Sequence, residues 1–184
     1  MQNNIKETLP VVKYGDPILR QKVKDITDFS DLKTLIDNMF NTMYKERGIG
    51  LAANQVGYGL NLLIIDTSSI EDSHNMKENK FIFINAKVID TKNSCIMEEG
   101  CLSVPDIRAE IERPEVITIE YQDTNQKLYR ETFSGIVSRV IQHELDHLNG
   151  KFFIDYLSPT KRRIIHKKLI EIAKKGKPST GVIL

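Results

Sequence analysis

The stretch IVSRVIQHELDHL, residues 136–148, predicts the helix around which the remaining elements are expected to assemble. It follows Gly135 and precedes Asn149-Gly150, a pair that is typical of a helix end. Residues 143–147 read H-E-x-x-H, and side chains four residues apart lie one turn above each other on a helix. Both imidazoles can therefore bind one divalent ion, while the intervening glutamate reaches a water molecule without being a ligand.

The third ligand decides the class of metal site, because catalytic sites usually have three protein ligands and one open position. A metzincin would need a histidine at Phe153, so that class is excluded. A thermolysin-like endopeptidase would use Glu171, whose isoleucine and lysine neighbours are typical of a helix surface. The remaining candidates are Cys101, which follows Gly100, and Cys95. A closed site with both cysteines would indicate a non-catalytic binding module instead.

The pattern of the other elements favours an α+β fold with antiparallel sheets around the central helix. An apolar stripe predicts an N-terminal helix over residues 31–47, and an irregular glycine-containing segment follows it. Ser158-Pro159 predicts the start of a C-terminal helix that ends near Gly176. The expected strands are 61–66, 81–89 and a hairpin of 116–121 with 127–133, and a polar loop covers 68–79.

Composition points to a cytoplasmic protein with one domain. The chain has 184 residues, a formal charge of +1, 40% hydrophobic residues and two cysteines, too few for a disulfide framework. It has no apolar run of membrane-spanning length and no recognisable targeting segment at its start. Residues 161–177 contain eight basic residues and one acidic residue. We therefore expect a catalytic body over 1–160 and a basic C-terminal helix and tail over 161–184, packed on the same domain.

Three segments together resemble the peptide deformylase family in kind, order and approximate separation. They are residues 48–55, GIGLAANQ, residues 99–103, EGCLS, and residues 142–150, QHELDHLNG. Supporting similarity extends from residues 15–20 to residues 155–159, so the resemblance covers most of the chain. It implies a bacterial-type, metal-dependent amidase that removes the formyl group from N-formylmethionyl nascent chains and releases formate.

The resemblance also implies a role for each matching residue. The metal ligands would be Cys101, His143 and His147, and Glu144 would be the general base and acid. The side chain of Gln55 and the backbone N–H of Leu102 would stabilise the negative charge that develops on the formyl oxygen.

Substrate binding is expected to use both backbone and side chains. The backbone around Ile49-Gly50 and Gly100 would pair with the extended peptide like an added strand. The helix-face residues Ile136 and Val140, with Met97, are candidate walls of the methionine pocket. The stem of Arg139 is expected to pack beside them while its charge points outward.

The remaining expectations concern the metal, the partners and the polar residues outside this set. The resemblance implies one divalent ion, Fe(II) in the working enzyme, although a Cys/His/His set also suits Zn, Co or Ni. The basic C-terminal helix is expected to contact ribosomal RNA during translation, and neither DNA nor a membrane is an expected partner. Asp146 is expected to orient a partner or to bond a nearby arginine, and His74 and His166 are expected to be solvated.

Overall fold

The structure is a computed structural model that describes residues 7–70 and 79–176. His74, most of the polar loop and the end of the basic tail lie outside these ranges. Within them, no helix combines the length and the apolar character needed to cross a membrane.

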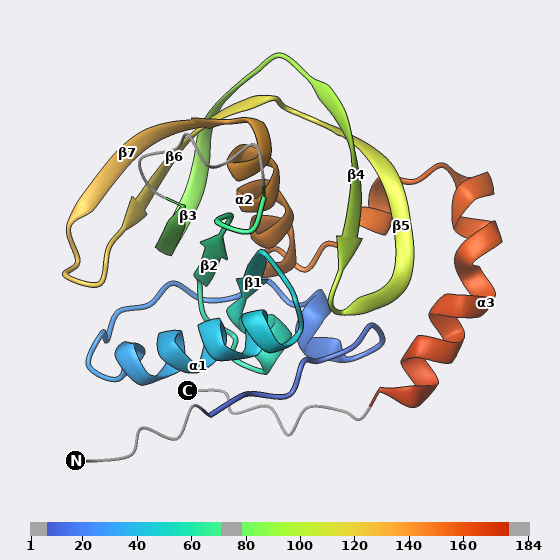
Figure 1. Ribbon diagram of the computed structural model, residues 1–184, viewed down its shortest axis with the longest axis horizontal. Helices are drawn as coiled ribbons and strands as arrows, with labels where there is room; N and C mark the ends of the chain where they lie inside the picture. The colour runs from blue at the N-terminus through green and yellow to red at the C-terminus, as the bar shows by residue number, and fades with distance from the viewer. Residues whose placement is uncertain (1–6, 71–78, 177–184) are drawn as a thin grey trace.

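The described residues form an α+β fold, which confirms the predicted class. Three α-helices and seven strands follow one another along the chain with short 3₁₀ turns between some of them (Figure 1). Their bounds are η1 Pro17–Arg20, α1 Leu32–Lys45, β1 Gly50–Ala52, η2 Ala53–Val56, β2 Leu62–Asp66, β3 Lys80–Lys92, β4 Cys95–Cys101, β5 Val104–Arg113, β6 Val116–Gln122, β7 Leu128–Ser134, α2 Gly135–Leu148, η4 Phe153–Tyr156 and α3 Pro159–Lys175.

Two antiparallel sheets lie on either side of α2. The larger has the strand order β1-β2-β3-β6-β7, and the smaller consists of β4 and β5 (Figure 1). Helix α2 packs on β1, β2 and β7, and its side chains also bond to β4 and β5. The H-E-x-x-H segment therefore lies in the middle of the molecule, as predicted.

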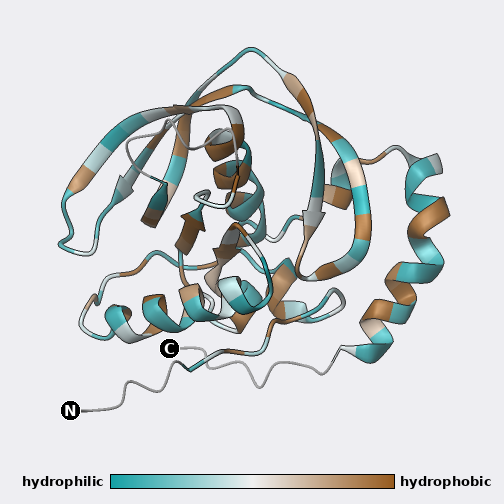
Figure 2. Cartoon of the chain, in the orientation of Figure 1, coloured by the Kyte–Doolittle hydropathy of each residue, from teal (hydrophilic) through white to brown (hydrophobic). Residues whose placement is uncertain are grey.

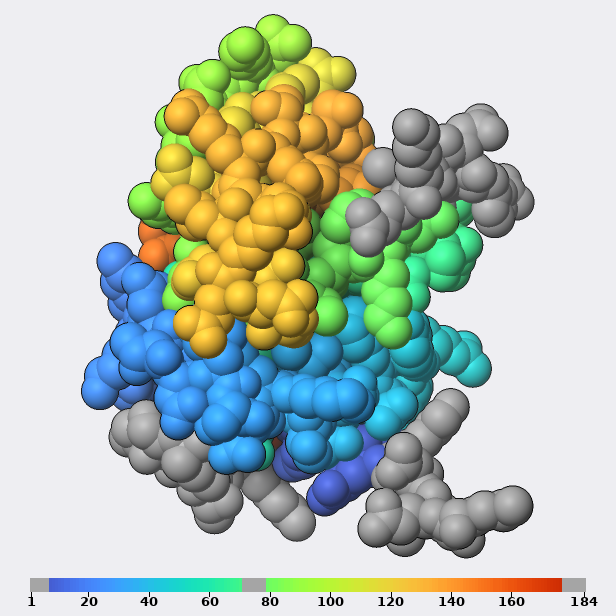
Figure 3. Space-filling model, turned by 90° about the vertical axis from the view of Figure 1, so that its left-hand side faces the viewer, coloured from blue at the N-terminus to red at the C-terminus, as the bar shows by residue number. Residues whose placement is uncertain are grey.

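The core explains why α1 and α2 form where the sequence predicts them. The inward stripe of α1 is buried and packs on β1 and β2. A second cluster joins α2 to the strands of the larger sheet, whose short strands β1 and β2 are predominantly apolar (Figure 2). Viewed from the side, α1 and the segment before it lie directly below the β6–β7 hairpin (Figure 3).

Two parts of the predicted arrangement need correction. The segment after Gly48 was expected to be irregular, but it contains strand β1, which pairs with β2 from Gly50 to Ala52. No ranges were predicted for strands β4 and β5. The sequence of β4, CIMEEGC, lacks the alternation of apolar and polar residues by which a half-buried strand is recognised, because polar Glu99 is one of its buried positions.

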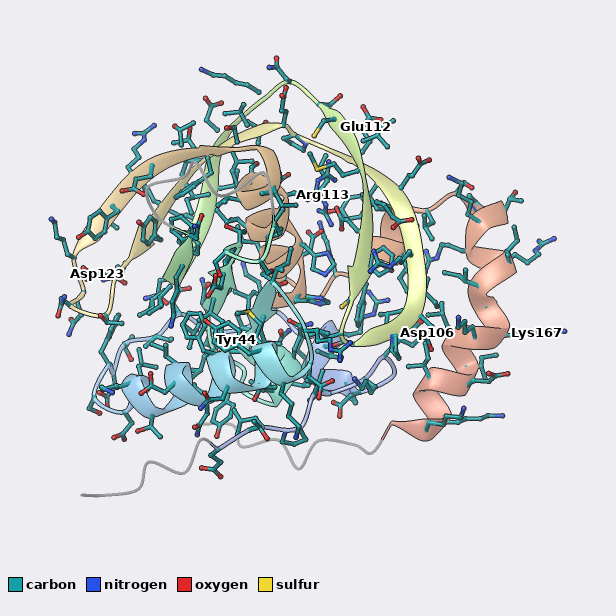
Figure 4. All side chains as sticks on the ribbon, in the orientation of Figure 1. Tyr44, Asp106, Glu112, Arg113, Asp123 and Lys167 are labelled. Atoms are coloured by element: carbon teal, nitrogen blue, oxygen red, sulfur yellow. The ribbon has the colours of Figure 1, made fainter. Side chains whose placement is uncertain are left out.

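Fewer of the apolar residues of α3 are buried than its sequence suggests. Leu169 and Ile172 are buried and Ile165 is half-buried, whereas Ile164 is 76% exposed. Positions 165, 169 and 172 are spaced four and three apart and form one stripe, which shares a hydrophobic cluster with residues of β5. Outside this stripe, the ammonium group of Lys168 donates to the backbone oxygen of Asp106 in β5 at 2.6 Å. The basic side chains point outward, as Lys167 does in Figure 4.

We predict that Gly150→Ala destabilises the fold by about 2 kcal/mol or more. Gly150 has a φ of +73°, and a Cβ there would lie 2.5 Å from the backbone oxygen of Arg20. The measurement is the free energy of unfolding in denaturant. Gly59→Ala is the matched control, because a Cβ at Gly59 meets nothing within 4 Å. Equal stabilities of the two variants would contradict the prediction.

Candidate active site

Three potential metal ligands converge where the end of β4 meets α2. One ligand atom from each of Cys101, His143 and His147 lies within 4.8 Å of the other two, the only such group of three or more in the described residues. The Cys101 Sγ atom lies 3.1 Å from Nε2 of His147. The structure thus brings together the three residues that the resemblance implied.

The position of Cys101 follows from an irregularity at the end of β4. The pairing register shifts between Gly100 and Cys101, and Cys101 faces Val104 across a tight connection to β5. The backbone N–H of Ser103 lies 3.4 Å from Sγ and donates to it. The thiol is therefore fixed at the turn of a hairpin. The two imidazoles lie beside it on the same face of α2, because His143 and His147 are four residues apart.

The carboxylate of Glu99 orients one of these imidazoles and was not predicted. One Glu99 oxygen lies 2.8 Å from Nδ1 of His143, which leaves Nε2 of that ring for the donor cluster. Arg113 donates to both Glu99 oxygens at 2.6 and 3.1 Å. Glu99 and Cys101 share one face of β4 because they are two residues apart. This relation can be recognised in the sequence only once the segment is known to be a strand.

Arg113 extends this network to the far side of α2. Its guanidinium donates to Asp146 at 2.6 Å, and the Tyr156 hydroxyl donates to the other Asp146 oxygen at 3.0 Å. The side chain of Arg113 extends from the end of β5 toward α2 (Figure 4). Of the two roles expected for Asp146, the structure shows the bond to an arginine.

The expectation for Arg139 was wrong in one respect, because its charge does not point outward. Arg139 is 4% exposed. Its guanidinium donates to Glu99 at 2.9 Å and to the backbone oxygens of Ile111 and Cys95 at 2.9 and 2.7 Å. A buried carboxylate and two carbonyl groups replace the water that an outward-pointing guanidinium would bind.

Glu144 lies in contact with the cavity and has the properties of a general base. Burial raises the pKa of Glu144 to about 7, although the adjacent His143 opposes this shift. Its Oε2 atom has no hydrogen-bond partner in the described part of the chain. A Cβ on Gly50 would lie 2.6 Å from the other carboxylate oxygen, so a glycine is required for this approach.

The surroundings shift the pKa values of the two histidines in opposite directions. Burial opposes protonation of His143, but its bonds to Cys101 and Glu99 raise its pKa well above the ordinary value. Burial and the neighbouring His143 lower the pKa of His147 well below that value. A cysteine sulfur and two imidazoles fit a divalent cation, which displaces any protons from the ligand atoms when it binds.

The amide of Gln55 faces the same cluster. Its Oε1 accepts a hydrogen bond of 2.8 Å from the backbone N–H of Ala52, which directs Nε2 toward Cys101 and Ser103. Leu102 adjoins the cysteine, and its own carbonyl accepts from Lys13 at 2.9 Å. Both expected oxyanion donors are thus beside the cluster.

A cavity of about 630 Å³ opens beside the donor cluster. Ile49, Gly50, Gly100, Ile136, Arg139 and Val140 line it together with Gln55, Leu102, Cys101, His143 and Glu144. Met97 is half-buried on β4 and does not line it. Glu171 and His166 are exposed on α3, and Cys95 contacts Arg139 rather than the cluster.

We predict that Glu99→Gln destabilises the protein by roughly 3 kcal/mol near neutral pH, because Arg113 and Arg139 lose a buried counter-charge. Burial alone would raise the pKa of Glu99, but its bonds with His143 and Arg113 lower it from 4.5 to about 2. The stabilisation from this ionised carboxylate is therefore present above about pH 4.5 and is lost as the pH falls toward 2.

The measurement is the unfolding free energy of wild type and Glu99→Gln as a function of pH. The difference between them should shrink between pH 4.5 and 2. A difference that stays constant over this range would contradict the assigned network.

Comparison with known proteins identifies the family. The polypeptide deformylase family model matches residues 8–163. The chain is 43% identical over 176 residues to the peptide deformylase of Christiangramia forsetii, covering 90% of each, and 44% identical over 165 residues to that of Zymomonas mobilis, covering 89% and 93%.

Solved structures agree with this match. A crystal structure of Plasmodium falciparum peptide deformylase has a TM-score of 0.82 and 37% identity, covering 90% of this chain and 95% of that one. The Thermus thermophilus peptide deformylase has a TM-score of 0.83 and 31% identity, covering 92% and 100%. The fold, the grouping of a cysteine with two histidines and these similarities lead to one conclusion: the chain belongs to the polypeptide deformylase family.

Proposed function

We propose that this protein is a metal-dependent peptide deformylase that hydrolyses the N-terminal formyl group of N-formylmethionyl nascent chains and releases formate. The observation that carries this proposal is a buried carboxylate with one unpartnered oxygen, Glu144, beside a Cys/His/His donor set in a cavity. Family membership supplies the substrate class.

A divalent ion bound by Cys101, His143 and His147 would act as a Lewis acid that lowers the pKa of a water molecule toward neutrality. Glu144 takes a proton from the attacking water and then transfers it to the amine that leaves. Gln55 Nε2 and the Leu102 N–H donate hydrogen bonds to the formyl oxygen as it becomes negative. Because Oε1 of Gln55 is already bonded to Ala52, its amide needs no reorientation for this role.

The two strands beside the cavity supply a binding edge for the peptide backbone. β1 and β4 are each the last strand of their sheet, so each pairs with one neighbour and has a second edge available. An extended peptide can pair with such an edge through its main chain. Ile136 and Val140 then offer an apolar wall to the methionine side chain, and the buried Arg139 closes the space beside them.

Selectivity for a formyl group follows from its size. The formyl carbon carries a hydrogen where a peptide carbonyl carries Cα. A cavity enclosed by Glu144, Val140 and the glycine-containing strand β1 can admit the first group and exclude the second.

The physiological ion is proposed to be Fe(II), with Zn, Ni or Co as possible occupants of the same donors. A thiolate ligand is a target for oxidation, so the iron-loaded enzyme should lose activity in air. Because its proposed substrates are nascent chains, the protein is also proposed to act in the cytoplasm.

The basic helix α3 is proposed to contact the ribosome. Its outer face presents exposed lysines and arginines together with the exposed Ile164 and Ile170. Phosphate groups of RNA attract such a surface. Residues 161–184 would then act as a docking segment on a single catalytic domain.

We predict that Glu144→Gln lowers kcat for formate release on the order of a thousandfold, because the amide cannot accept the proton. Metal content should remain that of wild type, since Glu144 is not a ligand. Glu171→Gln, an exposed change on α3, serves as the control and should retain full activity. Substantial deformylation by Glu144→Gln would contradict the assigned base.

Metal retention separates this proposal from a metallo-endopeptidase with Glu171 as third ligand. Cys101→Ser should reduce the bound metal per chain, whereas Glu171→Ala should leave it unchanged, as measured by metal analysis after gel filtration. The reverse pattern would support the endopeptidase. Cys95→Ala should release formate at the wild-type rate, and its inactivity would support a closed four-ligand site.

The ribosome contact is testable without disturbing the packing of α3. Replacing Lys167, Lys174 and Lys175 by glutamine leaves the buried Leu169 and Ile172 in place. We expect weaker co-sedimentation with ribosomes at low salt and a smaller salt dependence. The same change at the exposed Lys33, Lys127 and Lys151 is the control, and equal binding by both triple variants would refute the contact.

A further inference from the structure

Besides Oε2 of Glu144, two buried polar atoms, one on a ligand histidine and one on a residue bonded to its backbone, have no hydrogen-bond partner among the described residues. They are Oδ1 of Asn54 in η2 and Nδ1 of His147 in α2. Both residues are 0% exposed. Buried polar groups in folded proteins almost always have a partner, so this pair needs an explanation.

The orientation of the Asn54 amide is fixed by its other end. Its Nδ2 donates to the backbone oxygen of His147 at 2.6 Å. The reversed amide would place Oδ1 against that carbonyl and oppose two acceptors. Oδ1 is therefore a fixed acceptor, buried beside the same histidine whose backbone the amide binds.

The imidazole of His147 requires such an acceptor. Its Nε2 faces the Cys101 Sγ atom at 3.1 Å, so Nε2 must present a lone pair there if the ring is to bind a cation. A neutral imidazole has one N–H, which then lies on Nδ1 and becomes a donor. His143 has the Glu99 carboxylate at its Nδ1, whereas His147 has no such partner in the described residues.

We propose that Asn54 is a positioning residue for His147 and acts through one enclosed water molecule. The water accepts from Nδ1–H and donates to Oδ1 of Asn54. This bridge satisfies both unpartnered atoms, fixes the ring tautomer and directs Nε2 toward the metal. The inference rests on the metal site of the proposed function. It adds Asn54 to the residues that shape this site, in addition to the hydrogen bond that Asn54 makes with the backbone of His147.

The direct test is zinc affinity, measured by competition with a chelator, for wild type, Asn54→Ala and Asn149→Ala. Asn149 is the matched control, because its Nδ2 likewise donates to a carbonyl of α2, Leu145 O, at 2.8 Å. We expect a 10- to 100-fold loss of affinity for Asn54→Ala and wild-type affinity for Asn149→Ala. Equal affinities of all three proteins would overturn the inference and leave the metal site itself supported. A wild-type protein that binds no zinc would contradict both.

A second measurement needs only the zinc-loaded wild type. It therefore tests the inference even when Asn54→Ala does not fold. Nitrogen-resolved NMR should show the His147 ring proton on Nδ1, exchanging slowly and with a cross-peak to a bound water. In Asn54→Ala, where the variant folds, the same proton should exchange faster. A ring proton on Nε2, or an Nδ1 proton without a water contact, would overturn the inference.

Discussion

The Glu99 carboxylate is the contact on which the arrangement of the site depends. It is 5% exposed and interacts with Arg113, Arg139 and His143 at distances between 2.6 and 3.1 Å. Two guanidinium groups compensate the burial of its charge, and its bonds with His143 and Arg113 lower the pKa of the carboxyl group and keep it ionised. The ionised oxygen can then accept a hydrogen bond from the His143 imidazole. The smaller sheet and α2 are therefore joined at the point where the metal ligands meet.

This connection explains how two sheets and one helix produce a defined centre. Strand β4 contributes Glu99 and Cys101 from the same face, while α2 contributes Arg139 and His143 one turn apart. Each partner would be costly to bury alone, and together they satisfy one another. The result is a polar wall around a cavity whose other side consists of the apolar residues Ile136 and Val140 and the glycine-containing edge of β1.

Short-range spacing in the sequence allowed the helices, most of the larger sheet and two ligands, His143 and His147, to be predicted, whereas Cys101 was implied only by the family resemblance. The stripe of α1, the H-E-x-x-H turn and the β6–β7 hairpin belong to this group. It did not reveal β4, whose one fully buried residue, Glu99, is charged and so mimics a solvated residue, nor β5, whose buried Ile107 and Ile111 are followed by the buried, charged Arg113. The burial of Arg139 was missed for the same reason, since its partner Glu99 lies 40 residues earlier in the chain. Pairings between distant polar residues leave no periodic pattern that can be read along the chain.

The central claim is that one thiolate and two imidazoles surround a single metal ion. X-ray absorption spectroscopy at the zinc edge of the zinc-loaded protein tests it most directly. The account predicts one sulfur ligand at about 2.3 Å and two nitrogen ligands at about 2.0–2.1 Å, with a further light atom from solvent. A spectrum without a sulfur ligand, or with two sulfur ligands, would contradict it.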